Sequence, residues 1–126
     1  DIVLLIVAAL SKSQLKDFYD LSTELGMSVL VEVHTGQELE SAMDISPRMI
    51  GVNSRNLKTL EVDTQAFSEL IPQIPSGIIR VAESGISTRK DVEFAQSVGA
   101  SVILVGEALV KSGDPISAMQ ELLGHR

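Results

Sequence analysis

The sequence predicts an α/β protein built around a parallel sheet, because short apolar runs alternate with amphipathic helical segments. Five such runs begin near residues 2, 28, 49, 78 and 101, and a helical pattern follows each of them. The runs are rich in Ile, Val and Leu, whereas aromatic residues make up only 3% of the chain. Strands buried on both faces of a parallel sheet have this composition. We therefore expect right-handed strand–helix–strand crossovers.

The expected helix boundaries rest on capping residues that precede apolar stripes at helical spacing. A Ser or Thr followed three residues later by an acidic residue is typical of a helix N-terminus. Gly26 and Gly99 stand where two helices are expected to end, and Pro72 ends a third. The expected caps are Ser11 or Ser13, Thr35 with Glu38, Asp63, Thr88 with Asp91, and Asp114 before Pro115.

Two architectures accommodate five strand–helix units. One is an open, doubly wound sheet of the flavodoxin type, and the other is part of a (β/α)₈ barrel, which needs about 250 residues to close. At 126 residues the chain is long enough for one domain, and length alone favours the open sheet. The chain enters a strand directly after Asp1, so we do not expect Asp1 to be a natural start.

Composition argues against several classes of function. The net charge of −7 is the wrong sign for a nucleic-acid surface. Without cysteine the chain has no disulfide, thiol nucleophile or thiolate metal site. The acidic residues lie on separate strands without histidines at ligand spacing, so we expect no metal. No apolar run is long enough to cross a membrane, and we expect a cytoplasmic protein with no membrane partner.

Polar side chains stand where the predicted strands end. Glu32, Asn53 with Arg55, Glu83 and Glu107 each follow an apolar run. Because the carboxyl ends of parallel strands meet at one edge of a sheet, these side chains should face one cavity. Two carboxylates there can divide acid and base work. The alternative is that each is a loop carboxylate in water, although burying Glu32 without a role would be costly.

Two strand-end turns have the pattern of a phosphate site. Ser84-Gly85 and Gly106-Glu107 each place a small residue before a helical segment, where backbone N–H groups can hold an anion. In barrels such a site is formed by the loops after strands seven and eight. A histidine in the position of His34 more often caps or hydrogen-bonds a loop than takes part in catalysis. The lysines, Lys111 among them, are expected to be solvated loop or helix residues.

The strand-end segments resemble those of indole-3-glycerol-phosphate synthase, an enzyme family of tryptophan biosynthesis. The similarity runs nearly end to end, and the segments at 50–59 and 82–86 are highly specific in this order and spacing. The matching segments are VLLIV (3–7), LVEVH (30–34), IGVNSRNLKT (50–59), AESGI (82–86) and LVGEAL (104–109). The resemblance implies a (β/α)₈ TIM barrel, present here as a partial barrel of about five βα units. Residues 1–126 would be the C-terminal part of this single domain, strands four to eight.

The resemblance also implies a reaction, the closure of 1-(2-carboxyphenylamino)-1-deoxyribulose 5-phosphate to indole-3-glycerol phosphate. This carboxy-lyase step releases CO₂ and water and needs no cofactor or metal. Glu32 would be the general base of the dehydration. Asn53 and Glu83 would hydrogen-bond the substrate's hydroxyls and reacting centre, and Arg55 would lie near the anthranilate carboxylate. Ser84, Gly85, Gly106 and Glu107 would hold the phosphate, and Leu4 or Leu5 would line the apolar wall.

The same resemblance implies what the chain lacks. In the family, the general-acid lysine, a second substrate-binding lysine and another catalytic glutamate lie on the first and third strands, outside residues 1–126. Loss of a general acid typically lowers the rate by about 10²–10⁴-fold, so we expect the chain alone to be inactive. Five strands also leave two unpaired edges. We therefore expect the fragment to self-associate or to pair with the missing N-terminal strands.

Two other interpretations stay open. In the first, the chain is a non-catalytic half-barrel that binds phosphate. Turnover of the ring-closure substrate would distinguish the enzyme from this binding module. The chain can also belong to a different phosphate-handling barrel, such as an epimerase or isomerase. The segment at residues 53–59 speaks against that last class, but only through the family resemblance.

Overall fold

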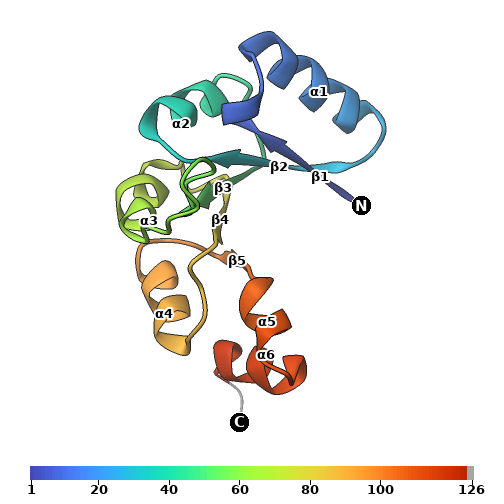
Figure 1. The fold of residues 1–126 in the computed structure, drawn as a ribbon. Coiled ribbons are helices and arrows are strands. Elements are labelled where there is room, and N and C mark those ends of the chain that lie inside the picture. The colour runs from blue at the N-terminus through green and yellow to red at the C-terminus, as the bar shows by residue number, and fades with distance from the viewer. Residues whose placement is uncertain (125–126) are drawn as a thin grey trace.

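The structure, a computed structural model, describes residues 1–124 and contains one sheet of five parallel strands (Figure 1). The strands are β1 (Ile2–Ile6), β2 (Ser28–Val33), β3 (Met49–Asn53), β4 (Ile79–Glu83) and β5 (Val102–Leu104). The helices are α1 (Lys12–Glu24), α2 (Gly36–Met43), α3 (Gln65–Leu70), α4 (Arg89–Ser97), α5 (Glu107–Lys111) and α6 (Pro115–Leu123), with 3₁₀ turns η1 (Val7–Ala9) and η2 (Ile71–Gln73). The predicted α/β class with a parallel sheet is confirmed.

The order of the strands decides between the two architectures. Each strand pairs with its neighbour in the sequence, which gives the order β1-β2-β3-β4-β5. A flavodoxin-like sheet has the order 2-1-3-4-5, because the chain changes direction once. Sequential strands with right-handed crossovers place their helices on one face, as in a barrel. The sheet is a barrel segment, and the open sheet that length alone favoured is wrong.

One face of the sheet packs against the helices and forms an aliphatic core. Leu15, Leu39 and Phe67, from α1, α2 and α3, are buried against this face. Burial of each such side chain contributes about 1.5–3 kcal/mol. The strand residues that alternate onto the same face are Leu5, Val29, Val31, Val33, Ile50, Val52 and Ala82.

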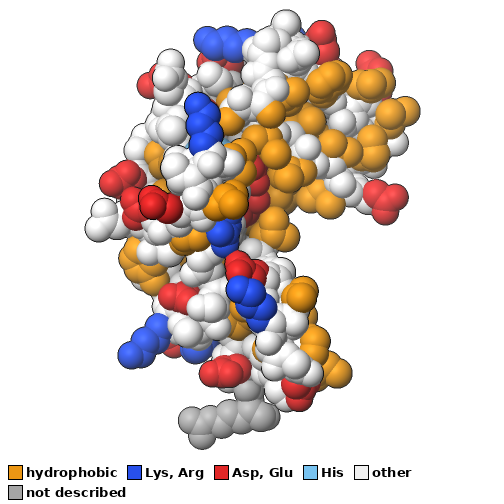
Figure 2. Space-filling view, viewed as in Figure 1, with side chains coloured by type: hydrophobic (Ala, Val, Ile, Leu, Met, Phe, Trp, Pro, Cys, Tyr) orange, Lys and Arg blue, Asp and Glu red, His pale blue; other side chains and the backbone are white. Residues whose placement is uncertain are grey.

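The opposite face of the sheet is concave and is not covered by the helices of the described residues. In Figure 2 hydrophobic side chains gather around a hollow on this side of the molecule. Leu30 and Val81 are buried at its centre by their neighbours. Five residues on β1, β4 and β5 are between 43% and 58% exposed: Ile2, Leu4, Ile79, Val102 and Leu104. The side chains of the site described below project from this same face.

Most of the predicted caps are present. Ser11, rather than Ser13, caps α1 and forms a reciprocal capping box with Gln14. Thr88 and Asp91 form the same arrangement at α4. Gly26 follows α1 at φ +77°, a backbone conformation that glycine adopts without penalty.

Two predicted caps differ from the structure. Asp63 is not the N-cap of α3, because Thr64 takes that position with helical backbone angles. The Asp63 carboxylate instead accepts a hydrogen bond from the N–H of Gln65 at 3.0 Å, in a turn before the helix. At α2 only half of the predicted box forms: Thr35 caps the Glu38 N–H, but the Glu38 carboxylate turns back to His34.

Candidate active site

Three polar side chains lie at the C-terminal ends of adjacent strands and point to the concave face. Glu32 is the second-to-last residue of β2, whereas Asn53 ends β3 and Glu83 ends β4; Asn53 and Glu83 are register partners. Side chains alternate between the faces of a strand, so all three share the face opposite the helices. Glu32 and Glu83 are each only 3% exposed. The convergence at one edge of the sheet that the sequence predicted is therefore present.

Glu32 and Glu83 form a buried pair of carboxyl groups. Burial raises the pKa of Glu83 from its ordinary value of 4.5 to about 9, and both a hydrogen bond to Glu32 and the negative charge of Glu32 act in the same direction. Glu83 is therefore protonated at neutral pH. One carboxyl of the pair can donate a proton while the other accepts one, which is the division of roles that acid–base chemistry needs.

Gly51 provides the space that the Glu83 carboxyl occupies. A Cβ at this position would lie 2.1 Å from Glu83 Oε2 and 3.1 Å from Leu30 Cδ1. Glu83 Oε2 accepts no hydrogen bond from an N–H or hydroxyl group of residues 1–124. Gly51 is the register partner of Glu32 on the neighbouring strand. The missing side chain on β3 thus allows carboxyl groups from β2 and β4 to approach each other across the strand between them.

A histidine and a third glutamate extend this acidic pair. His34 Nε2 lies 3.6 Å from Glu32 Oε2, and His34 Nδ1 lies 3.1 Å from Glu38 Oε1. The backbone N–H of His34 donates to the same Glu38 oxygen at 3.0 Å. His34 therefore does more than cap a loop. Glu38 was missed as part of the site because its spacing from Thr35 predicts a capping role, and nothing in the sequence indicates that it faces the histidine.

The loop after β3 is held by its own polar side chains. Asn53 Oδ1 accepts a hydrogen bond from the Arg55 N–H at 2.9 Å, so this amide oxygen helps to fix the loop. The Arg55 guanidinium donates to the Leu60 carbonyl at 3.0 Å and to Glu107 Oε2 at 2.9 Å. Arg55 therefore connects the loop after β3 to the start of α5, 52 residues further along the chain.

The turn after β4 is sharply bent. Ser84 and Gly85 have φ angles of +67° and +69°, the left-handed region that costs a non-glycine residue about 1–2 kcal/mol. A Cβ at Gly85 would lie 2.8 Å from Val62 Cγ1 and 3.0 Å from Ser54 Oγ. Ser54 is itself buried and donates to the Glu83 carbonyl through both its N–H and its hydroxyl. Only glycine fits this close approach of the two loops.

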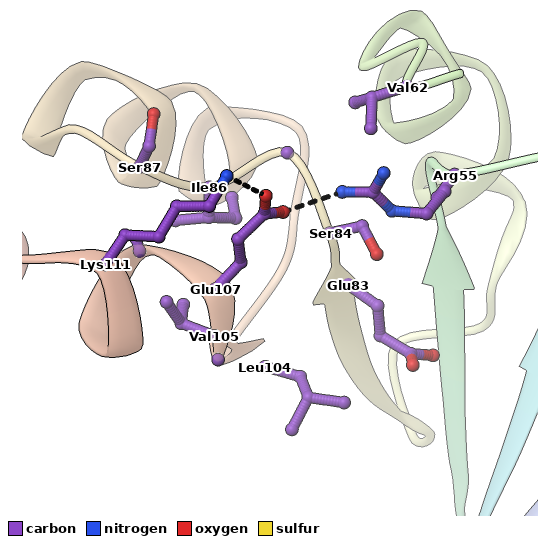
Figure 3. A pocket seen from close by; sticks show the side chains of 13 residues that line it. Arg55, Val62, Glu83, Ser84, Ile86, Ser87, Leu104, Val105, Glu107 and Lys111 are labelled. Carbon is purple, nitrogen blue, oxygen red and sulfur yellow. Dashed lines mark hydrogen bonds and ion pairs between the residues drawn. The ribbon is translucent and has the colours of Figure 1, made fainter. Parts of the chain in front are cut away.

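A cavity of about 690 Å³ lies where the loops after β3, β4 and β5 meet (Figure 3). Six of the eight predicted site residues line it: Arg55, Glu83, Ser84, Gly85, Gly106 and Glu107. Glu32 and Asn53 do not line it and stand instead on the concave face beside Glu83. Glu83 therefore belongs both to the cavity and to the carboxyl pair.

Two cations meet one carboxylate at the mouth of this cavity (Figure 3). Glu107 accepts from Lys111 Nζ at 2.6 Å as well as from Arg55. The hydrogen bond from Lys111 lowers the pKa of the Glu107 carboxyl, and the positive charges of Lys111 and Arg55 lower it further. Lys111 is a solvated helix residue, as predicted, with a side chain that is 74% exposed, and it also lines the cavity.

Neither metal-binding clusters nor membrane-spanning helices are present in residues 1–124. No three side chains of His, Asp or Glu converge as a metal site requires. None of the helices described has both the length and the apolar character to cross a membrane.

Comparison with known proteins places this chain in a family. The sequence model described as indole-3-glycerol phosphate synthase matches residues 1–122. The chain belongs to this family. Over 98% of its length it is 51% identical to the indole-3-glycerol phosphate synthase of Kineococcus radiotolerans and 49% identical to that of Rhodococcus jostii. The chain covers 45% and 46% of those two proteins, so it spans about half the length of these relatives.

Solved structures of lower identity share the fold. A thiamine phosphate pyrophosphorylase from Pyrococcus furiosus superimposes with a TM-score of 0.73 at 18% identity, over 98% of this chain and 58% of that one. A mandelate oxidase structure with benzoyl-formic acid gives 0.67 at 16% identity, over 90% of this chain and 37% of the other. These likenesses concern the arrangement of strands and helices and support a partial barrel.

Proposed function

We propose that the chain is the C-terminal part of an indole-3-glycerol-phosphate synthase. It would contribute the phosphate-binding site and a carboxylate base to the ring closure. The reaction would convert 1-(2-carboxyphenylamino)-1-deoxyribulose 5-phosphate to indole-3-glycerol phosphate with loss of CO₂ and water. The single observation that carries the proposal is the carboxyl pair of Glu32 and Glu83 beside the cavity lined by Ser84, Gly85 and Gly106. Groups suited to proton transfer and to anion binding would thereby lie side by side.

The resemblance to the family implies a role for each group. Glu32, which lies beside Glu83, would remove the proton in the dehydration half of the reaction. Asn53 and Glu83 would hydrogen-bond the ribulose-derived hydroxyls and the reacting centre, and Arg55 would sit near the substrate's carboxylate. Around the cavity, Ser84, Gly85, Gly106 and Glu107 would receive the phosphate through backbone N–H groups.

We also propose that the 126-residue chain does not catalyse the reaction by itself. No strand in residues 1–124 carries a lysine, so a general-acid lysine on the barrel wall would have to come from other strands. The exposed Leu4 and Leu104, near opposite edges of the concave face, would pack against those strands, or against a second copy of the chain. As a handler of a phosphorylated intermediate, the protein would act in the cytoplasm.

A reconstituted barrel tests the proposal. The chain is co-expressed with the part of the Kineococcus radiotolerans relative that lies outside the match. Appearance of the indole absorbance is then followed after addition of the phosphorylated substrate. We expect product from the pair, none from the chain alone, and a loss of about 10²–10⁴-fold with Glu32→Gln.

Two results would contradict it. An assembled pair, established by sedimentation, that forms no product would exclude the proposed reaction. Product formation that Glu32→Gln leaves unchanged would exclude the proposed base.

The second candidate, a half-barrel that only binds phosphate, is favoured by the cavity itself, because Arg55 and Lys111 face it and two strand-end glycines line it. Calorimetric titration of the 126-residue chain with inorganic phosphate tests this function without catalysis. Binding that Gly85→Ala abolishes, together with an inactive reconstituted barrel, would favour this second candidate over the enzyme.

A further inference from the structure

His34 and Glu38 lie next to Glu32 but have no part in the roles proposed above. The histidine ring is only 12% exposed and stands between the two carboxyl groups. Its Nδ1 and its backbone N–H both contact Glu38 Oε1, at 3.1 Å and 3.0 Å. Its Nε2 is buried, has no hydrogen-bond partner among residues 1–124, and faces Glu32 Oε2 at 3.6 Å.

The contact with Glu38 determines which ring nitrogen carries the proton. An ionised carboxylate accepts hydrogen bonds and donates none. A contact of 3.1 Å between Glu38 Oε1 and His34 Nδ1 therefore requires a proton on Nδ1. In the neutral ring the other nitrogen, Nε2, then bears a lone pair, because one nitrogen donates and the other accepts. That lone pair is directed at Glu32.

We propose that His34, held in this tautomer by Glu38, is a positioning residue that receives the proton which Glu32 takes up during the reaction. This inference rests on the role proposed for Glu32 as general base. In the step, the O–H bond of the Glu32 carboxyl breaks and an N–H bond forms at His34 Nε2. Glu32 becomes a carboxylate again and His34 becomes an imidazolium. The separation must shorten from 3.6 Å to about 3 Å for transfer.

The charged groups around the ring favour such a step. Glu32 on β2 and Glu38 on α2 lie on opposite sides of the imidazole, and their negative charges offset the positive charge that it gains. Glu83 on β4 lies beside Glu32 and is itself protonated, so it adds no negative charge. Lys12, at the start of α1, lines a cavity of about 330 Å³ together with Glu38.

Nitrogen NMR of the histidine ring tests the tautomer in the 126-residue chain, independently of activity. We expect the neutral ring of His34 to show a protonated Nδ1 and an unprotonated Nε2. Glu38→Gln keeps an oxygen acceptor and should keep this tautomer, whereas Glu38→Ala should shift the ring toward the Nε2–H form that is usual in water. Glu40→Ala, an exposed position on the same helix, is the matched control and should change nothing. A wild-type ring protonated at Nε2, or a tautomer that Glu38→Ala leaves unchanged, would overturn the proposal.

Kinetics of the reconstituted barrel test the proton transfer. His34→Ala should lower kcat more than tenfold with KM unchanged, and added imidazole should restore part of kcat, because a free base can then take the proton from Glu32. Full activity in His34→Ala, or a loss that imidazole does not relieve, would refute the role. A wild-type barrel without any activity would instead refute the proposed enzyme function, and the NMR result would still decide the tautomer.

Discussion

Replacement of Glu83 by Gln should remove most of the pH dependence of stability between pH 4.5 and about 9, the range over which the Glu83 pKa is raised. In this range the unfolded chain has released the Glu83 proton, whereas the folded chain keeps it. The stabilising contribution of this carboxyl is therefore complete below pH 4.5 and is lost as the pH rises toward 9. At about 1.4 kcal/mol per pH unit, raising the pH from 5 to 7 should lower the wild-type free energy of unfolding by about 3 kcal/mol.

Urea unfolding followed by circular dichroism at pH 5, 6, 7 and 8 measures this effect. Gln keeps the shape of the protonated carboxyl and can still donate to Glu32, so the variant should match the wild type near pH 5. At pH 7 it should be more stable than the wild type by up to about 3 kcal/mol. Glu40→Gln is an exposed control that should follow the wild-type curve. If Glu83→Gln also follows the wild-type curve, Glu83 is not the protonated partner and the assignment of acid and base fails.

Three further substitutions examine the surroundings of the pair and the cavity. Gly51→Ala would place a Cβ 2.1 Å from Glu83 Oε2 and should lower the free energy of unfolding by about 1–3 kcal/mol, as measured in urea. Gly85→Ala should lower the free energy of unfolding by at least about 1 kcal/mol because φ is +69° there. It should also weaken phosphate binding in calorimetric titration, and unchanged binding would argue against this turn as part of the phosphate site. Glu107→Gln frees Arg55 and Lys111 and should strengthen phosphate binding, more at low salt than at high salt.

The positions of the strands and of the polar residues at their ends could be predicted because both are local. The β-branched and apolar composition of a run such as residues 28–33 predicts that the strand is buried. Glu32 and Asn53 lie on one face of the sheet because the side chains of a strand alternate between its two faces. Strand order could not be obtained from length, since the same five units fit two architectures. Pairing of each strand with its sequence neighbour is a property of the assembled sheet.

Contacts between distant segments account for what the sequence did not predict. The Arg55–Glu107 ion pair joins residues 52 positions apart, and no local pattern indicates it. The helical spacing of Glu107 and Lys111 predicts their pair, but it does not indicate that Glu107 also binds Arg55. Glu38 satisfied a capping pattern, yet its carboxylate bonds to His34, one residue before the cap. For Glu107 and Glu38 the local pattern was present, and a second partner added a contact that the pattern does not predict.

The carboxylate of Glu107 would make the proposed phosphate site act like an anion exchanger. It already pairs with Arg55 and Lys111 and offsets part of their positive charge. A phosphate that entered the cavity would therefore compete with the Glu107 carboxylate rather than meet two unpaired cations. Return of Glu107 to the two cations would then assist release of the phosphate. Such a site would favour turnover over tight retention of its ligand.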